Sequence, residues 1–282
     1  MLAVERSGAG SPVLCLHGWP GGVSDYRLLT PLLVDTADVV VPHLPGFGDS
    51  FSPGDELRPP SDFSREAMVA ALVELMESLA LEPAVVVGYD VGVTTAIALA
   101  RAVPERVRAL VVGNALAPST FVPAALDLRR RAEFWYQDFH QLELASRLVD
   151  ANPAAVRTYL EHFWSHWGAR PDAVVDEALV AAYSRPGAFT ASLNWYRSGS
   201  STLYGALAIA EGGPLPSPVD VPAAVVWGAQ DPLFPPEFAP QVTELLPRAQ
   251  VRVLDDVGHF TPIEAAAEMA EAVRDLLHEK ES

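Results

Sequence analysis

Residues 84–92, with the sequence AVVVGYDVG, constrain the fold more than any other stretch of the chain. Three consecutive valines predict a buried strand, and the apolar run at 94–102 predicts a buried helix. Between them, Gly88 and Gly92 permit a sharp turn that lifts the side chain of Asp90 clear of the sheet. Aspartate is therefore a candidate nucleophile. The same pattern also occurs in ordinary loops that carry a solvated carboxylate, so the rest of the chain has to decide between the two.

Strands and helices alternate through the first part of the chain. Apolar runs predict strands at 11–16, 38–42, 84–87 and 107–112, and helices at 25–34, 65–79 (with Ser64 as N-cap) and 94–102. This alternation implies a parallel, doubly wound sheet with its ligand site at the carboxyl ends of the strands. The loop His17-Gly18-Trp19-Pro20 and the glycine-rich turn at 45–50 both follow strands and fall at that edge.

A change of pattern at residues 118–218 indicates an insertion. This segment is rich in aromatic residues, has a helical texture and contains no convincing strand, whereas the strand pattern returns at 223–227 and 251–254. The expected fold is α/β, with a mostly parallel doubly wound sheet and a helical cap at 118–218 inserted into a core formed by 1–117 and 219–282. A separate helical domain is the alternative. A chain of 282 residues, 50% of them hydrophobic, can bury a core of that size.

Two further polar residues follow the late strands. Asp231 comes shortly after the strand at 223–227, and a helix is predicted from residue 236. His259 comes shortly after the strand at 251–254, before a final helix that ends near residue 277. With Asp90 they give the chain order nucleophile, acid, histidine at successive strand ends. Asp255 and Asp256 are nearer to His259 in sequence and are the competing candidates for the acid.

Composition excludes several classes of partner. The formal net charge of −17 argues against nucleic acid and against anionic membranes, which would repel the protein. Cys15 is the single cysteine, so no intramolecular disulfide can form, and no metal-ligand spacing is present. The first ten residues lack the pattern of a signal peptide and no run is long enough to span a membrane, so we expect a cytoplasmic protein. A homodimer is compatible with the sequence, which does not fix the oligomeric state.

From about residue 11 to residue 277 the chain resembles the α/β-hydrolase superfamily and, within it, the epoxide hydrolases. The resemblance is carried by the HGxP loop at 17–20, by the aspartate at the nucleophile position, and by two motifs of the cap, Phe-Trp-Tyr-Gln at 134–137 and Asn-Trp-Tyr-Arg at 194–197. The first strand pair of the family is expected to be shortened, because only residues 2–5 precede the turn at 8–10.

The resemblance implies roles for particular residues. Asp90 would attack the epoxide to form an ester, while Tyr136 and Tyr196 would hold and protonate the departing oxygen. His259, oriented by Asp231, would activate the water that hydrolyses the ester to release a vicinal diol. The backbone N–H groups of Trp19 and Val91 would form the oxyanion hole. The residues implied as walls of an apolar pocket are His17, Pro20, Trp135, Phe139, Trp195 and Phe260. The partners would be a small epoxide and water, with no cofactor and no metal.

The sequence leaves two alternatives open. Haloalkane and haloacetate dehalogenases share the aspartate nucleophile, but the former place a halide-binding tryptophan directly after it and the latter place arginines there, where this chain has Val91 and Thr94. A catalytically silent homologue that binds a small ligand is the other alternative, and an intact triad disfavours it. An aspartate at position 90 also disfavours a serine esterase or lipase.

Overall fold

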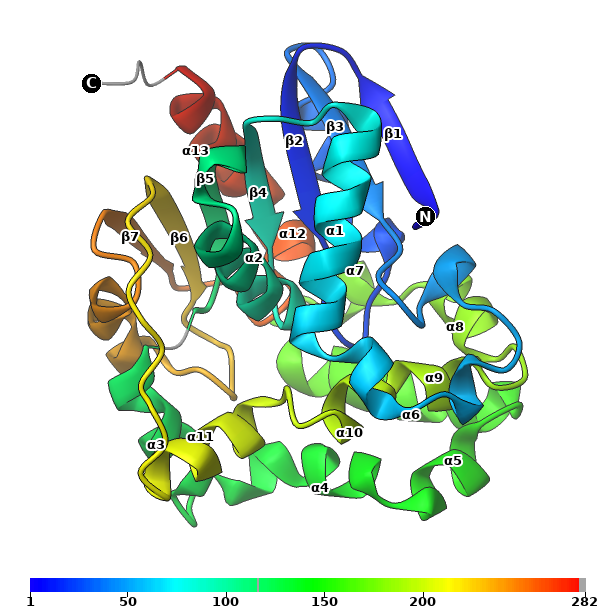
Figure 1. Ribbon diagram of the computed structural model, residues 1–282. Helices are drawn as coiled ribbons and strands as arrows, with labels where there is room; N and C mark the ends of the chain where they lie inside the picture. Colours follow the sequence, from blue (N-terminus) through cyan, green and yellow to red (C-terminus); the bar gives the residue numbers. More distant parts are fainter. Residues whose placement is uncertain (116, 279–282) are drawn as a thin grey trace.

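The computed structural model describes residues 1–115 and 117–278, and its framework is a seven-stranded sheet in the order β1-β3-β2-β4-β5-β6-β7 (Figure 1). The strands are β1 (Val4–Gly8), β2 (Ser11–Leu16), β3 (Ala37–Pro42), β4 (Ala84–Gly88), β5 (Val107–Gly113), β6 (Ala223–Gly228) and β7 (Ala249–Leu254). Only β1 runs antiparallel, paired with β3 at the edge, and every other pair is parallel. The predicted α/β class is confirmed. β1 is a strand of five residues.

Helices cover both faces of the sheet, which explains why its central strands are apolar throughout. Every residue of β3 and β4 is buried. In Figure 1, α1 (Arg65–Leu79) and α2 (Val91–Ala102) lie in front of the sheet, and α13 (Ala266–His278) lies behind it. The predicted cap of α1 is present, because the Ser64 side chain accepts a hydrogen bond from the Ala67 N–H at 3.3 Å.

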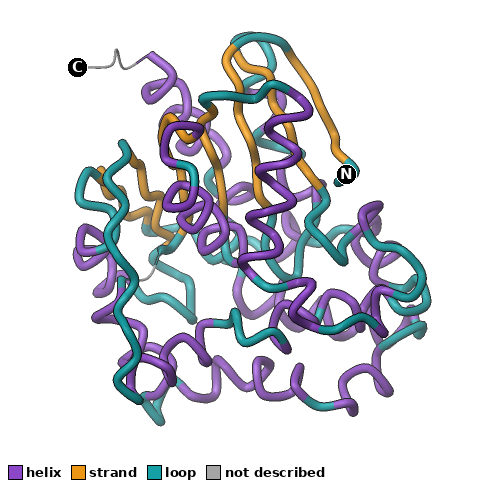
Figure 2. The backbone as a smooth tube through the Cα atoms, in the orientation of Figure 1, coloured by secondary structure: helices purple, strands orange, loops and turns teal. Residues whose placement is uncertain are grey.

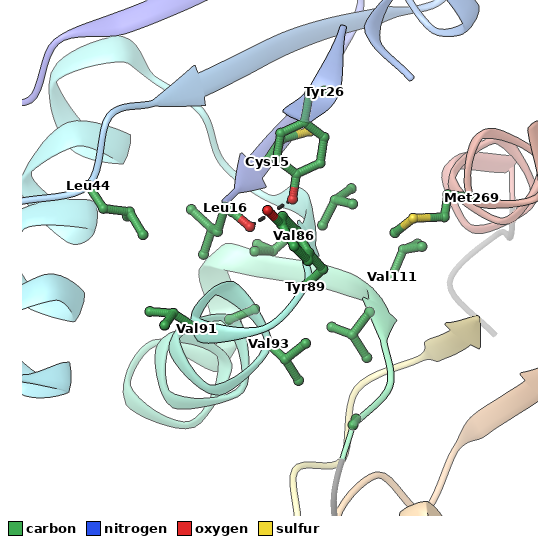
Figure 3. Close-up of a cluster of buried hydrophobic side chains, with 14 of the residues drawn as sticks. Cys15, Leu16, Tyr26, Leu44, Val86, Tyr89, Val91, Val93, Val111 and Met269 are labelled. Carbon is green, nitrogen blue, oxygen red and sulfur yellow. Dashed lines mark hydrogen bonds between the residues drawn. The ribbon is translucent and has the colours of Figure 1, made fainter. Parts of the chain in front are cut away.

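The packing between these layers is shown in Figure 3. Val91 and Val93 of α2 lie on one side of the strands, and Met269 of α13 lies on the other. The Tyr26 hydroxyl donates to the Leu16 carbonyl at 2.7 Å, so even the phenol buried in this core has a partner. Cys15 is fully buried, and burial raises the pKa of its thiol.

Two predicted helices are wrong in kind. Residues 25–34 form two short 3-10 turns, η1 (Val23–Tyr26) and η2 (Thr30–Leu32), because Pro31 lacks the N–H that an α-helix needs at that point. The segment after β6 is likewise a 3-10 helix, η8 (Pro236–Glu244), which contains Pro240. The last helix is preceded by a separate turn, α12 (Thr261–Glu264). The other short 3-10 turns of the core are η3 (Gly48–Ser50), η4 (Asp55–Leu57), η5 (Pro60–Phe63) and η6 (Pro104–Arg106).

Between β5 and β6 the described elements of regular secondary structure are helices. The elements are α3 (Pro118–Leu126), η7 (Arg131–Phe134), α4 (Trp135–Gln141), α5 (Glu143–Val149), α6 (Pro153–Trp167), α7 (Pro171–Val174), α8 (Glu177–Tyr183), α9 (Ala188–Ser192), α10 (Asn194–Arg197) and α11 (Thr202–Ala210). Figure 1 shows them gathered below the sheet, and an extended loop, teal in Figure 2, leads from α11 back to β6. The division at 118–218 remains a prediction.

None of the helices within residues 1–115 and 117–278 combines the length and the hydropathy that crossing a bilayer requires.

Candidate active site

Asp90 occupies the turn between β4 and α2 with a backbone of φ 52° and ψ −120°. Few non-glycine residues adopt a positive φ, and such residues are concentrated at functional sites. The flanking glycines are required by close packing. A Cβ on Gly92 would lie 2.0 Å from the Leu16 carbonyl oxygen, and a Cβ on Gly88 would lie 2.5 Å from the Gly92 carbonyl oxygen. The sharp turn therefore depends on both glycines, and it leaves the Asp90 side chain at the carboxyl end of the sheet.

The loop after β2 binds one oxygen of this carboxylate. The Trp19 N–H donates to Asp90 Oδ1 at 2.7 Å, and the Trp19–Pro20 peptide bond is cis. Val91 follows Asp90 as the first residue of α2, where helix N–H groups have no partner within the helix. Of the two backbone groups expected to form an oxyanion hole, the Trp19 N–H is thus bound to the Asp90 carboxylate, and the part of the Val91 N–H stays a prediction.

His259 lies between two carboxylates. Its Nδ1 is 2.7 Å from Asp231 Oδ2, and its Nε2 is 3.3 Å from Asp90 Oδ2. Of the three candidate acids, Asp231 is the one that contacts His259, whereas Asp255 and Asp256 are exposed. The backbone also fixes the histidine, since the His259 N–H donates to the Trp167 carbonyl at 2.9 Å.

Asn114 is part of this network and was not identified from the sequence. It follows β5, where its Nδ2 donates to Asp231 Oδ2 and its Oδ1 accepts from the Gly228 N–H at 2.7 Å. The other Asp231 oxygen accepts from the N–H groups of Leu233, at 2.8 Å, and Phe234, at 3.3 Å. Asp231 is therefore held in one orientation from both sides. Asn114 could have been identified from the sequence as a polar residue that directly follows a predicted strand.

Charge on the carboxylates outweighs burial at His259. Burial alone would lower the pKa of this imidazole, but the charge and hydrogen bond of Asp231, followed by those of Asp90, raise it to about 10. Both carboxylates therefore favour the protonated form of the imidazole. A reaction that neutralised Asp90 would remove one of the two stabilising charges and lower the pKa of His259.

Tyr136 of α4 and Tyr196 of α10 lie together against Trp19. Their ring centroids are 5.7 Å apart, and Trp19 stacks on Tyr136 at 5.9 Å and meets Tyr196 edge to face at 5.5 Å. Gln137 Nε2 donates to the Tyr136 hydroxyl at 3.0 Å. Burial first, together with other contributions that include the charge of Asp90, raises the pKa of both phenols well above the ordinary value. Both tyrosines therefore remain O–H donors across the neutral and alkaline range.

A single cavity brings the nucleophile and the tyrosines together. Its walls include Asp90, Val91, Tyr136, Tyr196 and Trp195. Of the six residues expected in the pocket wall, Trp195 is the one that lines this cavity.

The other five expected wall residues lie elsewhere. Trp135 and Phe139 point away from the cavity and line a separate surface groove, because they occupy the outer side of α4. His17 is a structural residue, with Nε2 accepting from the Leu44 N–H at 3.1 Å, and burial lowers its pKa to about 4. Pro20 is buried in its loop, and Phe260 packs edge to face on His259 with centroids 5.5 Å apart.

Comparison with known proteins places this architecture in a family. The model of the alpha/beta hydrolase fold matches residues 11–266, which is most of the chain. The chain belongs to the alpha/beta hydrolase fold family. This hydrolase is 30% identical to the 2-hydroxymuconate semialdehyde hydrolase of Pseudomonas sp. (strain CF600), over 99% of this chain and 91% of that protein. It is 27% identical to the soluble epoxide hydrolase of Corynebacterium sp. (strain C12), over 92% of this chain and 87% of that protein.

The solved structures agree on the fold. An alpha/beta hydrolase from Nostoc sp PCC 7120 superposes with a TM-score of 0.81 at 24% identity, covering 98% of this chain and 94% of that one. The names of the relatives support hydrolysis as the class of reaction for this hydrolase but differ in the bond that is cleaved.

A neutral residue at position 90 should show how much the charge of Asp90 contributes to the pKa of His259. In an Asp90→Asn variant of this hydrolase, we expect the pKa of His259 to fall below its wild-type value of about 10, because the Asp90 charge is gone while Asp231 remains. NMR titration of the histidine ring protons measures the pKa directly, with Asp255→Asn as the control that changes an exposed carboxylate. An unchanged pKa in Asp90→Asn would show that Asp90 has no influence on the base.

Proposed function

We propose that this hydrolase opens epoxides to vicinal diols through an ester on Asp90. The observation that carries the proposal is the pairing, in one cavity, of a carboxylate at the nucleophile position with two buried phenols. A carboxylate can attack a carbon of a strained ether and displace the ring oxygen if that oxygen receives a proton. The Corynebacterium relative, named a soluble epoxide hydrolase, supports the same activity.

In the first step Asp90 Oδ2 attacks one ring carbon, and the carbon–oxygen bond of the epoxide breaks. The alkoxide takes a proton from one of the two tyrosines, Tyr136 or Tyr196. The other tyrosine donates a hydrogen bond to the same oxygen. Because Oδ1 is already bound by the Trp19 N–H, it becomes the carbonyl oxygen of the ester while still held by that donor. The product of this half is a hydroxyalkyl ester of Asp90 and one phenolate.

In the second step water attacks the ester carbonyl of Asp90. Esterification removes the negative charge beside His259, which lowers the pKa of the imidazole. The imidazole then gives its extra proton to the phenolate left by the first step, and its neutral Nε2 can take a proton from the attacking water. The N–H groups of Trp19 and Val91 stabilise the tetrahedral oxyanion. Collapse releases the diol and regenerates the carboxylate, and the one proton set free by ester hydrolysis stays on His259, which restores the starting state of the site.

The origin of the new diol oxygen tests the proposal. With enzyme in excess over styrene oxide in heavy-oxygen water, the diol of the first turnover should carry no heavy oxygen, since its new oxygen comes from Asp90. Under multiple turnovers the diol should become labelled, because Asp90 has then exchanged an oxygen with water. Heavy oxygen in the diol of the first turnover would show direct attack by water. The absence of diol across a panel of epoxides, with halide released from haloalkanes, would identify a dehalogenase instead.

A further inference from the structure

The cavity extends from Asp90 along one face of α2. Its wall contains Val91, Thr94, Ile97 and Arg101, which are three or four residues apart and therefore share a side of the helix. At a rise of 1.5 Å per residue, the backbone separation between Asp90 and Arg101 is about 16 Å. The space beside the nucleophile is therefore long rather than round, and it ends at a guanidinium group.

A second arginine lies at the same end of the cavity. Arg65 begins α1 and lines the cavity, where its Nη2 donates to the Ser200 carbonyl at 2.7 Å and its guanidinium carbon lies 5.8 Å from the Trp195 ring centroid. Its Nε is buried without a hydrogen-bond partner. Burial lowers the pKa of Arg65, the charge of Glu66 opposes that shift, and the charge of Arg101 adds to it, so the two arginines are close enough to repel each other.

Within the part of the chain that the structure describes, no carboxylate forms an ion pair with Arg65 or Arg101. Neither Arg65 nor Arg101 has a carboxylate oxygen within 4.0 Å, although the chain has 36 acidic residues against 19 basic ones. Arg101 is otherwise bound only to the Ser217 carbonyl, at 2.7 Å. A partly buried guanidinium with an unused N–H is costly unless a partner is supplied. An anion in the cavity would supply one.

The stretch between the two ends is suited to an alkyl chain. Val93, Ile97 and Leu245 line it, and Phe234 adds an aromatic wall. The arginine end also carries the hydroxyl residues Ser201 and Thr202. The cavity thus has a reactive end, an apolar middle and a cationic, hydroxyl-rich far end.

We infer that this hydrolase acts on amphipathic epoxides that carry a carboxylate at the far end of an alkyl chain. The carboxylate binds between Arg65 and Arg101, the chain lies along α2, and the epoxide reaches Asp90. The inference rests on the proposed epoxide hydrolysis and adds the substrate class.

The test compares ω-epoxyundecanoate with its methyl ester, which has the same length and no charge. Since hydrogen bonds to charged groups contribute about 1.5–3 kcal/mol, we expect the acid to be favoured by about tenfold or more in kcat/KM, mainly through KM. The ratio of kcat/KM for the acid to kcat/KM for the ester should fall to near unity in the double variant Arg65→Gln/Arg101→Gln. It should fall partly in Arg101→Gln, a variant that should keep the fold because Arg101 is exposed. Arg147→Gln, at an exposed arginine of α5 outside the cavity, should leave the ratio unchanged. A short epoxy acid such as glycidate should gain nothing from its carboxylate.

Direct binding separates failure of this inference from failure of the proposed function. Calorimetry with undecanoate and with methyl undecanoate needs no turnover. Preferential, salt-sensitive binding of undecanoate that is lost in the double variant supports the anion site even if no epoxide is hydrolysed. Equal binding of the two ligands, or equal kcat/KM for acid and ester in the wild-type enzyme, would overturn the inference while leaving epoxide hydrolysis intact.

Discussion

Replacement of Asp90 with alanine should abolish turnover. The variant has no carboxylate to form the ester, and water has no activated carbonyl to attack, so we expect kcat to fall by at least about 10⁴-fold, as for other covalent nucleophiles. The measurement is diol formation from an epoxide that the wild-type enzyme hydrolyses, accompanied by circular dichroism and thermal unfolding. The fold should persist, because Asp90 lies at the end of the sheet and not in the layers that hold it together.

Asp255→Ala is the matched control for that experiment. Asp255 is an exposed carboxylate close to His259 in sequence and was a candidate for the acid, so its removal should leave turnover near the wild-type rate. If Asp90→Ala keeps even a tenth of the wild-type activity while remaining folded, the covalent mechanism is wrong.

The double variant Tyr136→Phe/Tyr196→Phe should lose ring opening more completely than either single variant. General acid catalysis contributes about 10²–10⁴-fold, and one phenol can partly replace the other because their rings lie 5.7 Å apart in the same cavity. Phenylalanine keeps the ring packing against Trp19, so the loss reports the hydroxyl groups. Pre-steady-state measurement of ester formation isolates this step from the hydrolysis that follows.

Tyr204→Phe provides the control, since Tyr204 of α11 is 40% exposed and does not line the cavity. We expect wild-type ester formation in that variant. A double variant that formed the ester as fast as the wild-type enzyme would remove both tyrosines from the mechanism and require another source of the proton.

The strand ends were predictable from the sequence because short apolar runs and glycine-flanked turns are local features. The position of Asp90 follows from residues 84–92 alone, and Asp231 and His259 could be brought near it because the carboxyl ends of parallel strands meet at one edge. Asn114 was not predicted as a site residue because a single amide after a strand resembles any loop residue. Only the fold places it against Asp231.

The cavity walls were less predictable, for a physical reason. Trp135 and Tyr136 are neighbours in one short helix, and which of them faces the nucleophile depends on how α4 is rotated against the other cap helices. Arg65 and Arg101 come from two helices, and nothing in their local sequence indicates that one cavity joins them. Pro31 argues against a continuous helix at 25–34, whereas the apolar spacing of that segment favours one. The prediction followed the apolar spacing.

Intact-protein mass spectrometry of a His259→Phe variant tests the central claim most directly. Without the base, the enzyme should form the ester and fail to hydrolyse it, so incubation with epoxides should add the whole mass of one epoxide to the protein, localised to the peptide that contains Asp90. A parallel incubation with haloalkanes should leave the mass unchanged. An adduct from a haloalkane minus its halide with none from any epoxide, or an epoxide adduct on a residue other than Asp90, would contradict the account.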